Sequence, residues 1–383
     1  MDIRERFKAS YGVEAEAAAA APGRLEVLGN HTDYNEGFVL SCAVGQRTVF
    51  AMRRVPGRIC RVRDFRDGSE TSFDLDRIDR PAPRDWGNYI RGVIVGLRRR
   101  GYEISAFDGA VLSDVPLSAG MSSSAALETA VGFAFSRAFG IELAPAEWAR
   151  VGQGVENDYL GLKTGLLDQF SSIFGRRDAL ILSDFRTVEV LKTVPLPPGY
   201  RLVVVNSMVK HNLVDSEYNS RRADCEACAA ALRRRFPGMK TLRDASMEDL
   251  EAVKDEISRR EFLRAGHVIG ECRRVRDGVH ALESGDIGAF GRLLFESHES
   301  SRVAFENSVP ELDYLVELAH SIPGCLGARL SGGGFGGITI HLVRAEAAEE
   351  YAARIAEAFA VKFSVRPGTI LCDIGDGARV LFP

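Results

Sequence analysis

The sequence of 383 residues predicts an α+β fold. Strand-like runs and helical periodicity occur in both halves of the chain, and they do not follow a strict β–α–β alternation. The clearest strand pattern is the apolar–polar alternation of Ile338–Val343, and the clearest helical pattern is that of Ala125–Phe139. A chain of this length is typical of two domains, or of one domain with an elaboration.

The individual elements follow from local periodicity. In Ala125–Phe139 the apolar side chains of Leu127 and Val131 share one helix face, and Gly140 is placed to end the helix. The other predicted helices are Tyr218–Phe236, Met247–Val253 and Glu311–Ser321. The predicted strands are Phe38–Val44, Val49–Arg53, Arg201–Asn206 and Ile338–Val343.

A domain boundary is predicted at Leu196–Gly199, where two prolines and a glycine separate two patterned halves. We therefore expect an N-terminal domain over residues 1–195 and a C-terminal domain over residues 196–383.

The composition excludes several classes of protein. With a formal net charge of −4 and 27% charged residues, the chain lacks the excess of basic residues that is typical of nucleic-acid-binding proteins. No apolar run approaches the roughly 20 residues of a membrane span, and Met1–Tyr11 lacks the apolar core of a secretory signal. Seven scattered cysteines fit free thiols in a reducing compartment, and Cys225 and Cys228 alone do not make a zinc site. We expect a cytoplasmic protein without nucleic-acid or membrane partners.

The first polar segment that could form a binding site is Pro22–Asn35, which places many hydrogen-bonding side chains in a turn between apolar runs. Short, stiff donors and acceptors held by strands are suited to the hydroxyls of a sugar ring. A hairpin turn rich in Asn and Gly is the alternative that the residues alone leave open.

The second segment, Pro116–Ser124, is rich in small residues and runs directly into the Ala125–Phe139 helix. Its backbone can approach a phosphate closely, and the helix N-terminus offers unpaired N–H groups and a positive dipole end. It is not a Walker A loop, because no Gly-Lys-Ser/Thr follows. A serine N-cap on a core helix would explain part of the pattern, but three consecutive serines exceed what capping requires.

The third segment, Ser331–Gly337, has five glycines in seven residues and precedes the Ile338–Val343 strand. Such a segment suits close packing against a ligand or another backbone, although a glycine loop alone is weak evidence.

In this order, the three segments resemble the signature motifs of GHMP kinases, and further matches resemble the galactokinase branch of that superfamily. The similarity runs from about Ala21 to the end of the chain. The matching stretches are Arg24 with His31–Asn35, Trp86–Tyr89 with Gly92–Val93, Gly165–Gln169, and Ser216–Tyr218 with Arg221–Arg222.

The resemblance implies a two-domain fold with the active site between the domains, and transfer of the γ-phosphate of ATP to the anomeric hydroxyl of a hexose. It implies that Asp168 accepts the hydroxyl proton and that Arg24 lies near Asp168 and the γ-phosphate. Ser124 and Glu156 are the implied Mg²⁺ ligands, both hard oxygen donors. The implied ATP-binding residues are Ser118, Ala119, Gly120, Met121, Ser122, Ser123 and Ser124.

The sugar contacts implied by the resemblance lie mainly in the first segment. Asp33 can accept hydrogen bonds from two neighbouring hydroxyls, which makes it the strongest specificity candidate. The implied substrate-binding residues are Asn30, His31, Thr32, Asp33, Asp184 and Tyr218.

The pattern departs from the family at two nearby positions. The family normally has Glu where this chain has Asn30, at the end of the site near the sugar's 6-hydroxyl, and it usually has Asn where this chain has Glu26. The loss of a charged acceptor at residue 30 predicts weaker discrimination at C6.

Two alternatives to galactokinase activity remain at this point: an anomeric kinase for another sugar, such as an N-acetylhexosamine, uronic acid or pentose, and a non-catalytic sugar sensor. Intact Asp168 and an intact serine loop favour catalysis over sensing. The expected partners are a small sugar and MgATP, and we expect a monomer or a weak dimer.

Overall fold

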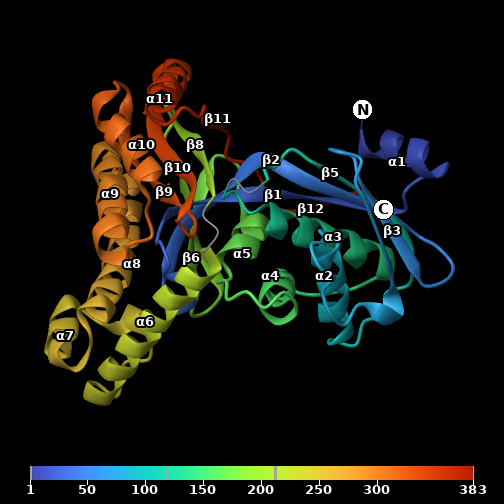
Figure 1. Ribbon diagram of the computed structural model, residues 1–383, viewed down its shortest axis with the longest axis horizontal. Helices are drawn as coiled ribbons and strands as arrows, with labels where there is room; N and C mark the ends of the chain where they lie inside the picture. The colour runs from blue at the N-terminus through green and yellow to red at the C-terminus, as the bar shows by residue number, and fades with distance from the viewer. Residues whose placement is uncertain (1, 118–119, 211–213, 383) are drawn as a thin grey trace.

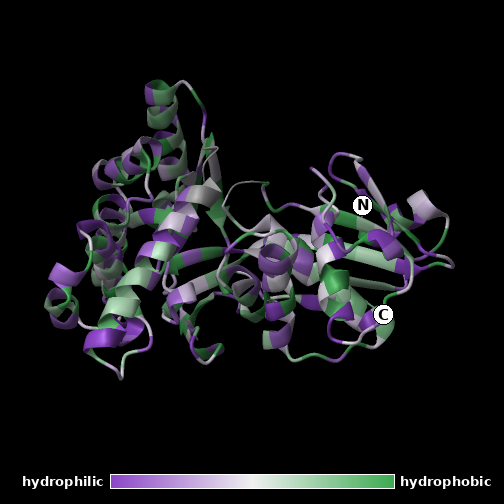
Figure 2. Ribbon diagram, turned by 60° about the horizontal axis from the view of Figure 1, so that its bottom comes forward, coloured by the Kyte–Doolittle hydropathy of each residue, from purple (hydrophilic) through white to green (hydrophobic). Residues whose placement is uncertain are grey.

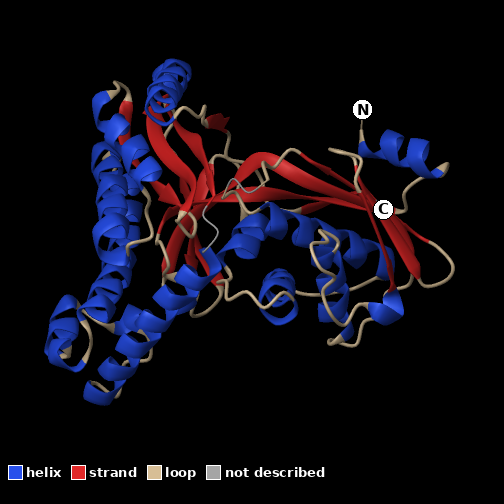
Figure 3. Ribbon diagram, in the orientation of Figure 1, coloured by secondary structure: helices blue, strands red, loops and turns tan. Residues whose placement is uncertain are grey.

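The computed structural model describes residues 2–117, 120–210 and 214–382. Two β-sheets, each with helices packed against it, meet near the middle of an elongated molecule (Figure 1). Strands and helices are intermixed along the chain (Figure 3), so the predicted α+β class is confirmed.

Within the described ranges, the larger sheet has eight strands in the order β12-β1-β2-β5-β3-β4, with β6 paired to β2 and β7 paired to β6. Its strands are β1 (Ala17–Leu28), β2 (Phe38–Arg54), β3 (Ile59–Asp64), β4 (Glu70–Asp74), β5 (Phe107–Ser113), β6 (Ala179–Asp184), β7 (Glu189–Pro195) and β12 (Arg379–Phe382). The smaller sheet is antiparallel, in the order β11-β8-β10-β9. Its strands are β8 (Tyr200–Lys210), β9 (Cys325–Ser331), β10 (Gly336–Arg344) and β11 (Gly368–Cys372).

The helices fall into two groups. Those of the first half of the chain are α1 (Ile3–Tyr11), α2 (Asn88–Arg98), α3 (Ser123–Phe139), α4 (Pro145–Gly154) and α5 (Leu167–Phe174). Those of the second half are α6 (Val214–Arg235), α7 (Met247–Ala252), α8 (Arg259–Glu283), α9 (Ile287–Ser300), α10 (Pro310–Ser321) and α11 (Ala348–Phe363).

Helices α2–α5 lie together along the larger sheet, whereas α9, α10 and α11 pack against the smaller one (Figure 1). Helix α8 packs on α6 and α9 and also touches β1 and β2, so it connects the two parts. The strands in the interior are mostly apolar, and polar residues gather on the outer helices and loops (Figure 2). One apolar cluster combines residues of both sheets, among them Leu25 of β1 and Ile340 of β10.

The four predicted helices are confirmed to within a few residues at their ends. Helix α3 ends as predicted at Gly140, whose φ of 65° lies in the left-handed region that glycine tolerates. Its apolar face packs under the larger sheet, where the rings of Phe50, Phe107 and Phe135 contact one another edge to face.

Two strand features differ from the sequence-based expectation. The runs Phe38–Val44 and Val49–Arg53 are parts of the single strand β2, because Arg47 and Thr48 continue the pairing with β1 after a register shift. The alanine-rich tract, for which no element was predicted, forms the start of β1, where Ala17–Ala21 are all buried. Alanine favours helices intrinsically, but β1 is paired on both edges and covered by α3, and small side chains fit that space.

The segment Leu196–Gly199 joins β7 of the larger sheet to β8 of the smaller one. The C-terminal strand β12 returns to the larger sheet and pairs with β1. The division into residues 1–195 and 196–383 stays a prediction. In the described part of the chain, no helix is both long enough and apolar enough to cross a bilayer.

Candidate active site

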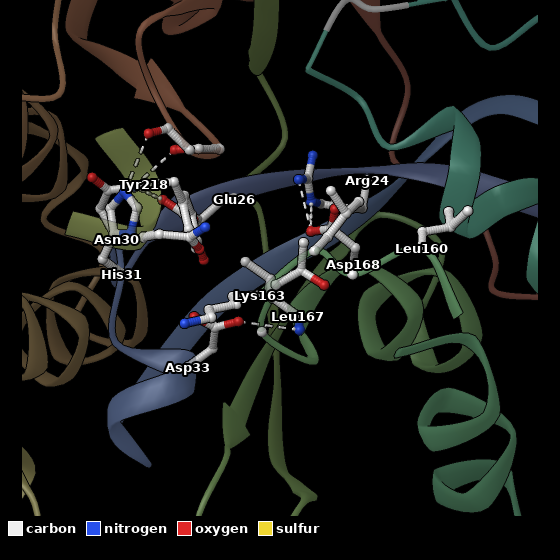
Figure 4. Close-up of a pocket in the computed structure, with 17 residues that line it drawn as sticks. Arg24, Glu26, Asn30, His31, Asp33, Leu160, Lys163, Leu167, Asp168 and Tyr218 are labelled. Carbon is white, nitrogen blue, oxygen red and sulfur yellow. Dashed lines mark hydrogen bonds and ion pairs between the residues drawn. The ribbon is translucent and has the colours of Figure 1, made fainter. Parts of the chain in front are cut away.

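A cavity of about 410 Å³ lies where β1, α6, the loop before α5 and the glycine turn between β9 and β10 come together (Figure 4). The three segments singled out in the sequence all reach this region. The cavity is lined by Arg24, Glu26, Asn30, His31, Asp33, Leu160, Gly161, Leu162, Lys163, Thr164, Gly165, Leu167, Asp168, Tyr218, Asn219, Gly332 and Gly333.

One wall of the cavity carries an ion pair between Arg24 of β1 and Asp168 at the start of α5 (Figure 4). Arg24 Nε and Nη2 lie 2.8 Å and 2.7 Å from Asp168 Oδ1. Arg24 Nη1 also donates to the carbonyl of Gly120 at 2.6 Å, and the hydroxyl of Ser122 donates to Asp168 Oδ2. This arrangement joins the carboxylate, the guanidinium and the serine loop in one cluster.

The serine loop enters α3 through a strained residue. Ser122 has φ 55° and ψ 58°, an uncommon backbone conformation for a residue with a side chain, which persists where the surroundings impose it. Met121 is fully buried, and its carbonyl accepts a hydrogen bond from the backbone N–H of Arg24. Ser118 and Ala119 lie outside the described residues.

Glu156 and Ser124 lie side by side behind this loop. Ser124 Oγ donates to Glu156 Oε1 at 3.1 Å, and Thr164 Oγ1 donates to Glu156 Oε2 at 2.7 Å. Glu156 belongs to a π-helical turn, an irregularity often found at functional sites. Burial, and next the charge of Asp168, raise the pKa of the Glu156 carboxyl, so a cation at this position would favour its ionised form.

The opposite wall is formed by the tight turn after β1. His31 adopts a positive φ of 60°, and its Nε2 lies 3.2 Å from the carbonyl oxygen of Gly333 in the glycine turn. The Tyr218 ring lies 5.0 Å from the His31 ring. Burial lowers the pKa of His31 to about 3, so this imidazole is neutral at ordinary pH.

Asp33 also lines the cavity and is tied to the start of α5, the helix that carries Asp168. Its Oδ2 accepts a hydrogen bond of 3.4 Å from the backbone N–H of Leu167. Burial, and next the charge of Glu26, raise the pKa of Asp33 to about 6. A Cβ atom on Gly165 would lie 1.5 Å from Asp33 Oδ2, so only glycine fits beside this carboxylate.

Two expected sugar contacts lie away from the cavity. The Thr32 hydroxyl is buried 2.8 Å and 2.6 Å from the carbonyl oxygens of Gly29 and Phe38, where it holds the turn. Asp184, at the end of β6, is paired with Arg243, whose Nη2 donates to Oδ2 at 2.8 Å. Both side chains are hydrogen-bonded to protein groups and neither lines the cavity, so their role as sugar contacts stays a prediction.

Sequence reasoning did not assign several residues that line the cavity, among them Lys163, Asn219 and Glu26. Lys163 belongs to the loop over residues 160–165, and the only available signal was its position just before the matched stretch Gly165–Gln169. Glu26 was noted as a departure from the family pattern, but no role followed from the sequence.

The fold and site define a class of protein, the GHMP kinases. Residues 88–176 match the family model described as GHMP kinases N terminal domain, and residues 279–361 match GHMP kinases C terminal. A crystal structure of mevalonate kinase, 17% identical over 93% of this chain and 98% of its own, superposes with a TM-score of 0.62 and shares the fold.

The remaining comparisons are more specific. Residues 5–54 match the model described as galactokinase galactose-binding signature. Galactokinase of Roseiflexus sp. is 41% identical over 98% of this chain and 96% of its own length, and that of Chloroflexus aggregans is 39% identical over 99% and 97%. The crystal structure of Lactococcus lactis galactokinase complexed with galactose has a TM-score of 0.93 and 30% identity, covering 98% of both chains. The chain belongs to the galactokinase family.

Proposed function

We propose that this protein transfers the γ-phosphate of ATP to the anomeric hydroxyl of galactose. The observation that carries the proposal is the cluster of Arg24, Asp168 and Ser122 between the cavity and the N-terminus of α3. A sugar in the cavity and a nucleotide at the serine loop would meet at this cluster. The proposal extends to this chain the activity for which its relatives are named.

Asp168 is the proposed acceptor of the anomeric proton. Each of its oxygens already contacts a protein group, Oδ1 two nitrogens of Arg24 and Oδ2 the hydroxyl of Ser122, which orients the carboxylate and leaves a further lone pair on Oδ2. Arg24 places a positive charge beside the reacting groups, where negative charge develops during phosphoryl transfer.

The nucleotide phosphates are proposed to bind at the serine loop and the first turn of α3. The unpaired N–H groups and the dipole of a 17-residue helix favour a polyanion at its N-terminus.

Ser124 and Glu156 are the proposed protein ligands for Mg²⁺. Their oxygens are hard donors only 3.1 Å apart, and Mg²⁺ in kinases binds few protein oxygens and completes its shell with phosphates and water. When bound, the ion would neutralise charge on the phosphates.

The test of the proposal is ADP release from MgATP across a panel of hexoses, pentoses, uronic acids and N-acetylhexosamines, with and without Mg²⁺. We expect galactose to give the highest kcat/KM and omission of Mg²⁺ to abolish turnover. A matched Glu156→Gln variant should need more Mg²⁺ for half-maximal rate at an unchanged galactose KM. Preference for another sugar, or Mg²⁺-independent turnover, would contradict the respective part of the proposal.

The pH dependence should report on Asp33. We expect kcat/KM for galactose to fall as the pH is lowered through about 6, since protonation of Asp33 replaces an acceptor that the sugar hydroxyls need with a donor. His31 cannot cause this change, because its pKa is about 3. The check is the pH profile of kcat/KM at saturating MgATP, and a flat profile between about pH 5 and 7 would exclude Asp33 as the binding carboxylate.

A further inference from the structure

The Asn30 side chain has no hydrogen-bonding capacity left for a ligand. Its Nδ2 donates to Glu26 Oε1 at 2.8 Å and to the carbonyl of Gly332 at 2.9 Å. Its Oδ1 accepts from Ser301 Oγ at 3.2 Å and from Asn307 Nδ2 at 3.0 Å. An amide has two donors and two acceptor sites, so all four are used by the protein.

The orientation of this amide is fixed by its neighbours. A carboxylate and a carbonyl can only accept, so the NH₂ group of Asn30 must face Glu26 and Gly332. The residue is also entirely buried, with an exposed fraction of 0%. Asn30 borders the cavity, but its amide is saturated by protein groups, so it supports its neighbours.

Glu26 is the neighbour that reaches the cavity. Its Oε1 accepts from Asn30 and from Arg329 Nη2, the latter at 2.9 Å, whereas Oε2 accepts no hydrogen bond from a described residue. Glu26 lines the cavity and keeps an exposed fraction of 4%. This oxygen, which accepts from no described residue, is available to a donor on a ligand in the cavity, and a ligand that buried it unpaired would bind less well.

Arg329 keeps this carboxylate in place from the smaller sheet. Its side chain is fully buried, and its Nη1 donates to the carbonyl of Val27 at 3.1 Å. Burial raises the pKa of the Glu26 carboxyl, and the Arg329 guanidinium opposes that effect. A buried guanidinium requires a counter-charge, so the pair is retained as an ion pair.

Strand geometry places Glu26 away from the phosphoryl-transfer end of the cavity. Arg24 and Glu26 are two residues apart on β1, so their side chains project from the same face, about 7 Å apart along the strand. Arg24 is at the phosphoryl-transfer end with Asp168, and Glu26 lies with Asn30, His31 and Tyr218 at the other end (Figure 4).

We propose that Glu26, positioned by Asn30 and Arg329, accepts a hydrogen bond from the sugar's C6 hydroxyl and determines specificity at that end. The inference rests on the proposed function. The two departures from the family pattern are then linked, because the carboxylate expected at residue 30 is found at residue 26 instead. The two side chains are hydrogen-bonded to each other, so the negative charge stays in the same part of the site. The charged acceptor is retained, so the expectation of weak discrimination at C6 is reversed.

The first experiment needs no variant. The wild-type protein should use 6-deoxygalactose and galacturonate with a kcat/KM roughly 10- to 100-fold below that for galactose, because one leaves Glu26 Oε2 unpaired and the other brings a second anion against it. Equal efficiency with galactose and 6-deoxygalactose would overturn the inference and leave the proposed function standing. No galactose-dependent ADP release would contradict the proposed function itself.

The second experiment separates contact from structural support. Glu26→Gln replaces the free oxygen with a neutral donor, so the preference for galactose over galacturonate should fall roughly 10-fold or more, while the preference for galactose over 2-deoxygalactose should stay constant. If Glu26 had a purely structural role, the variant would lower kcat/KM for galactose, galacturonate and 2-deoxygalactose by the same factor, and that result would overturn the inference.

The third experiment tests the pairing of residues 26 and 30. Asn30→Glu alone brings two carboxylates within hydrogen-bond distance and should lower the melting temperature and the galactose kcat/KM. The double variant Glu26→Asn/Asn30→Glu removes this repulsion and should recover both quantities. A double variant no better than the single one would show that the two positions do not act as a unit.

Discussion

Replacing Asp168 by Ala is expected to lower kcat by about 10²–10⁴-fold, the range typical of losing a general base. The galactose Kd should change much less, because Asp168 lies at the reacting end of the cavity and Asp33 and Glu26 remain in place. The measurements are steady-state kinetics and equilibrium binding of galactose in the absence of ATP.

A matched control is Asp108→Ala. Asp108 on β5 is also held by an arginine, with Arg61 Nε at 2.9 Å, but it does not line the cavity. Its loss should change the melting temperature and leave kcat near the wild-type value. Near-normal kcat in folded Asp168→Ala protein would show that another group receives the proton.

Gly165→Ala is expected to raise the galactose KM strongly, by about 10²-fold. The new Cβ atom would lie 1.5 Å from Asp33 Oδ2 and 2.3 Å from its Cγ, so the carboxylate has to move. Displacement of a positioning group by about 1 Å can cost this much in rate. Gly165 lies just before α5, which begins with Leu167 and Asp168, so kcat should fall as well.

Gly154→Ala provides the comparison for this variant. Gly154 is the last residue of α4, and a Cβ there meets only Asp158 Oδ2, at an ordinary 3.5 Å. We expect unchanged kinetics and equal or higher stability, since alanine favours helices over glycine. Wild-type kinetics in Gly165→Ala would mean that Asp33 does not bind the sugar from the position described.

The motifs that depend on local sequence were the most predictable. Helix α3 follows from its periodicity and from Gly140, and the serine loop before it follows from small residues at a helix start. The motif order led to the galactokinase family, which the comparisons confirm. The pairing of Ser124 with Glu156 and of Arg24 with Asp168 agrees with the expected arrangement, although their roles stay predictions.

The buried alanine tract illustrates what local sequence does not determine. Ala17–Ala21 have no strand pattern, because every position is enclosed and no side faces water. Their conformation depends on β2, β12 and α3, which are distant in the sequence. Thr32 and Asp184 were likewise expected in the site, but hydrogen bonds to protein groups hold them outside the cavity.

By itself, the sequence determined the fold class and the family, because these depend on motifs whose order and spacing are visible along the chain. Only the tertiary structure decided which of the two residues Glu26 and Asn30 keeps a polar atom available at the cavity. Glu26 and Asn30 are both polar, but Ser301, Asn307 and Gly332 help to satisfy the amide, whereas no described residue donates to Glu26 Oε2. These three partners are more than 270 residues from Asn30 in the chain, so the hydrogen bonds that satisfy its amide form only after folding.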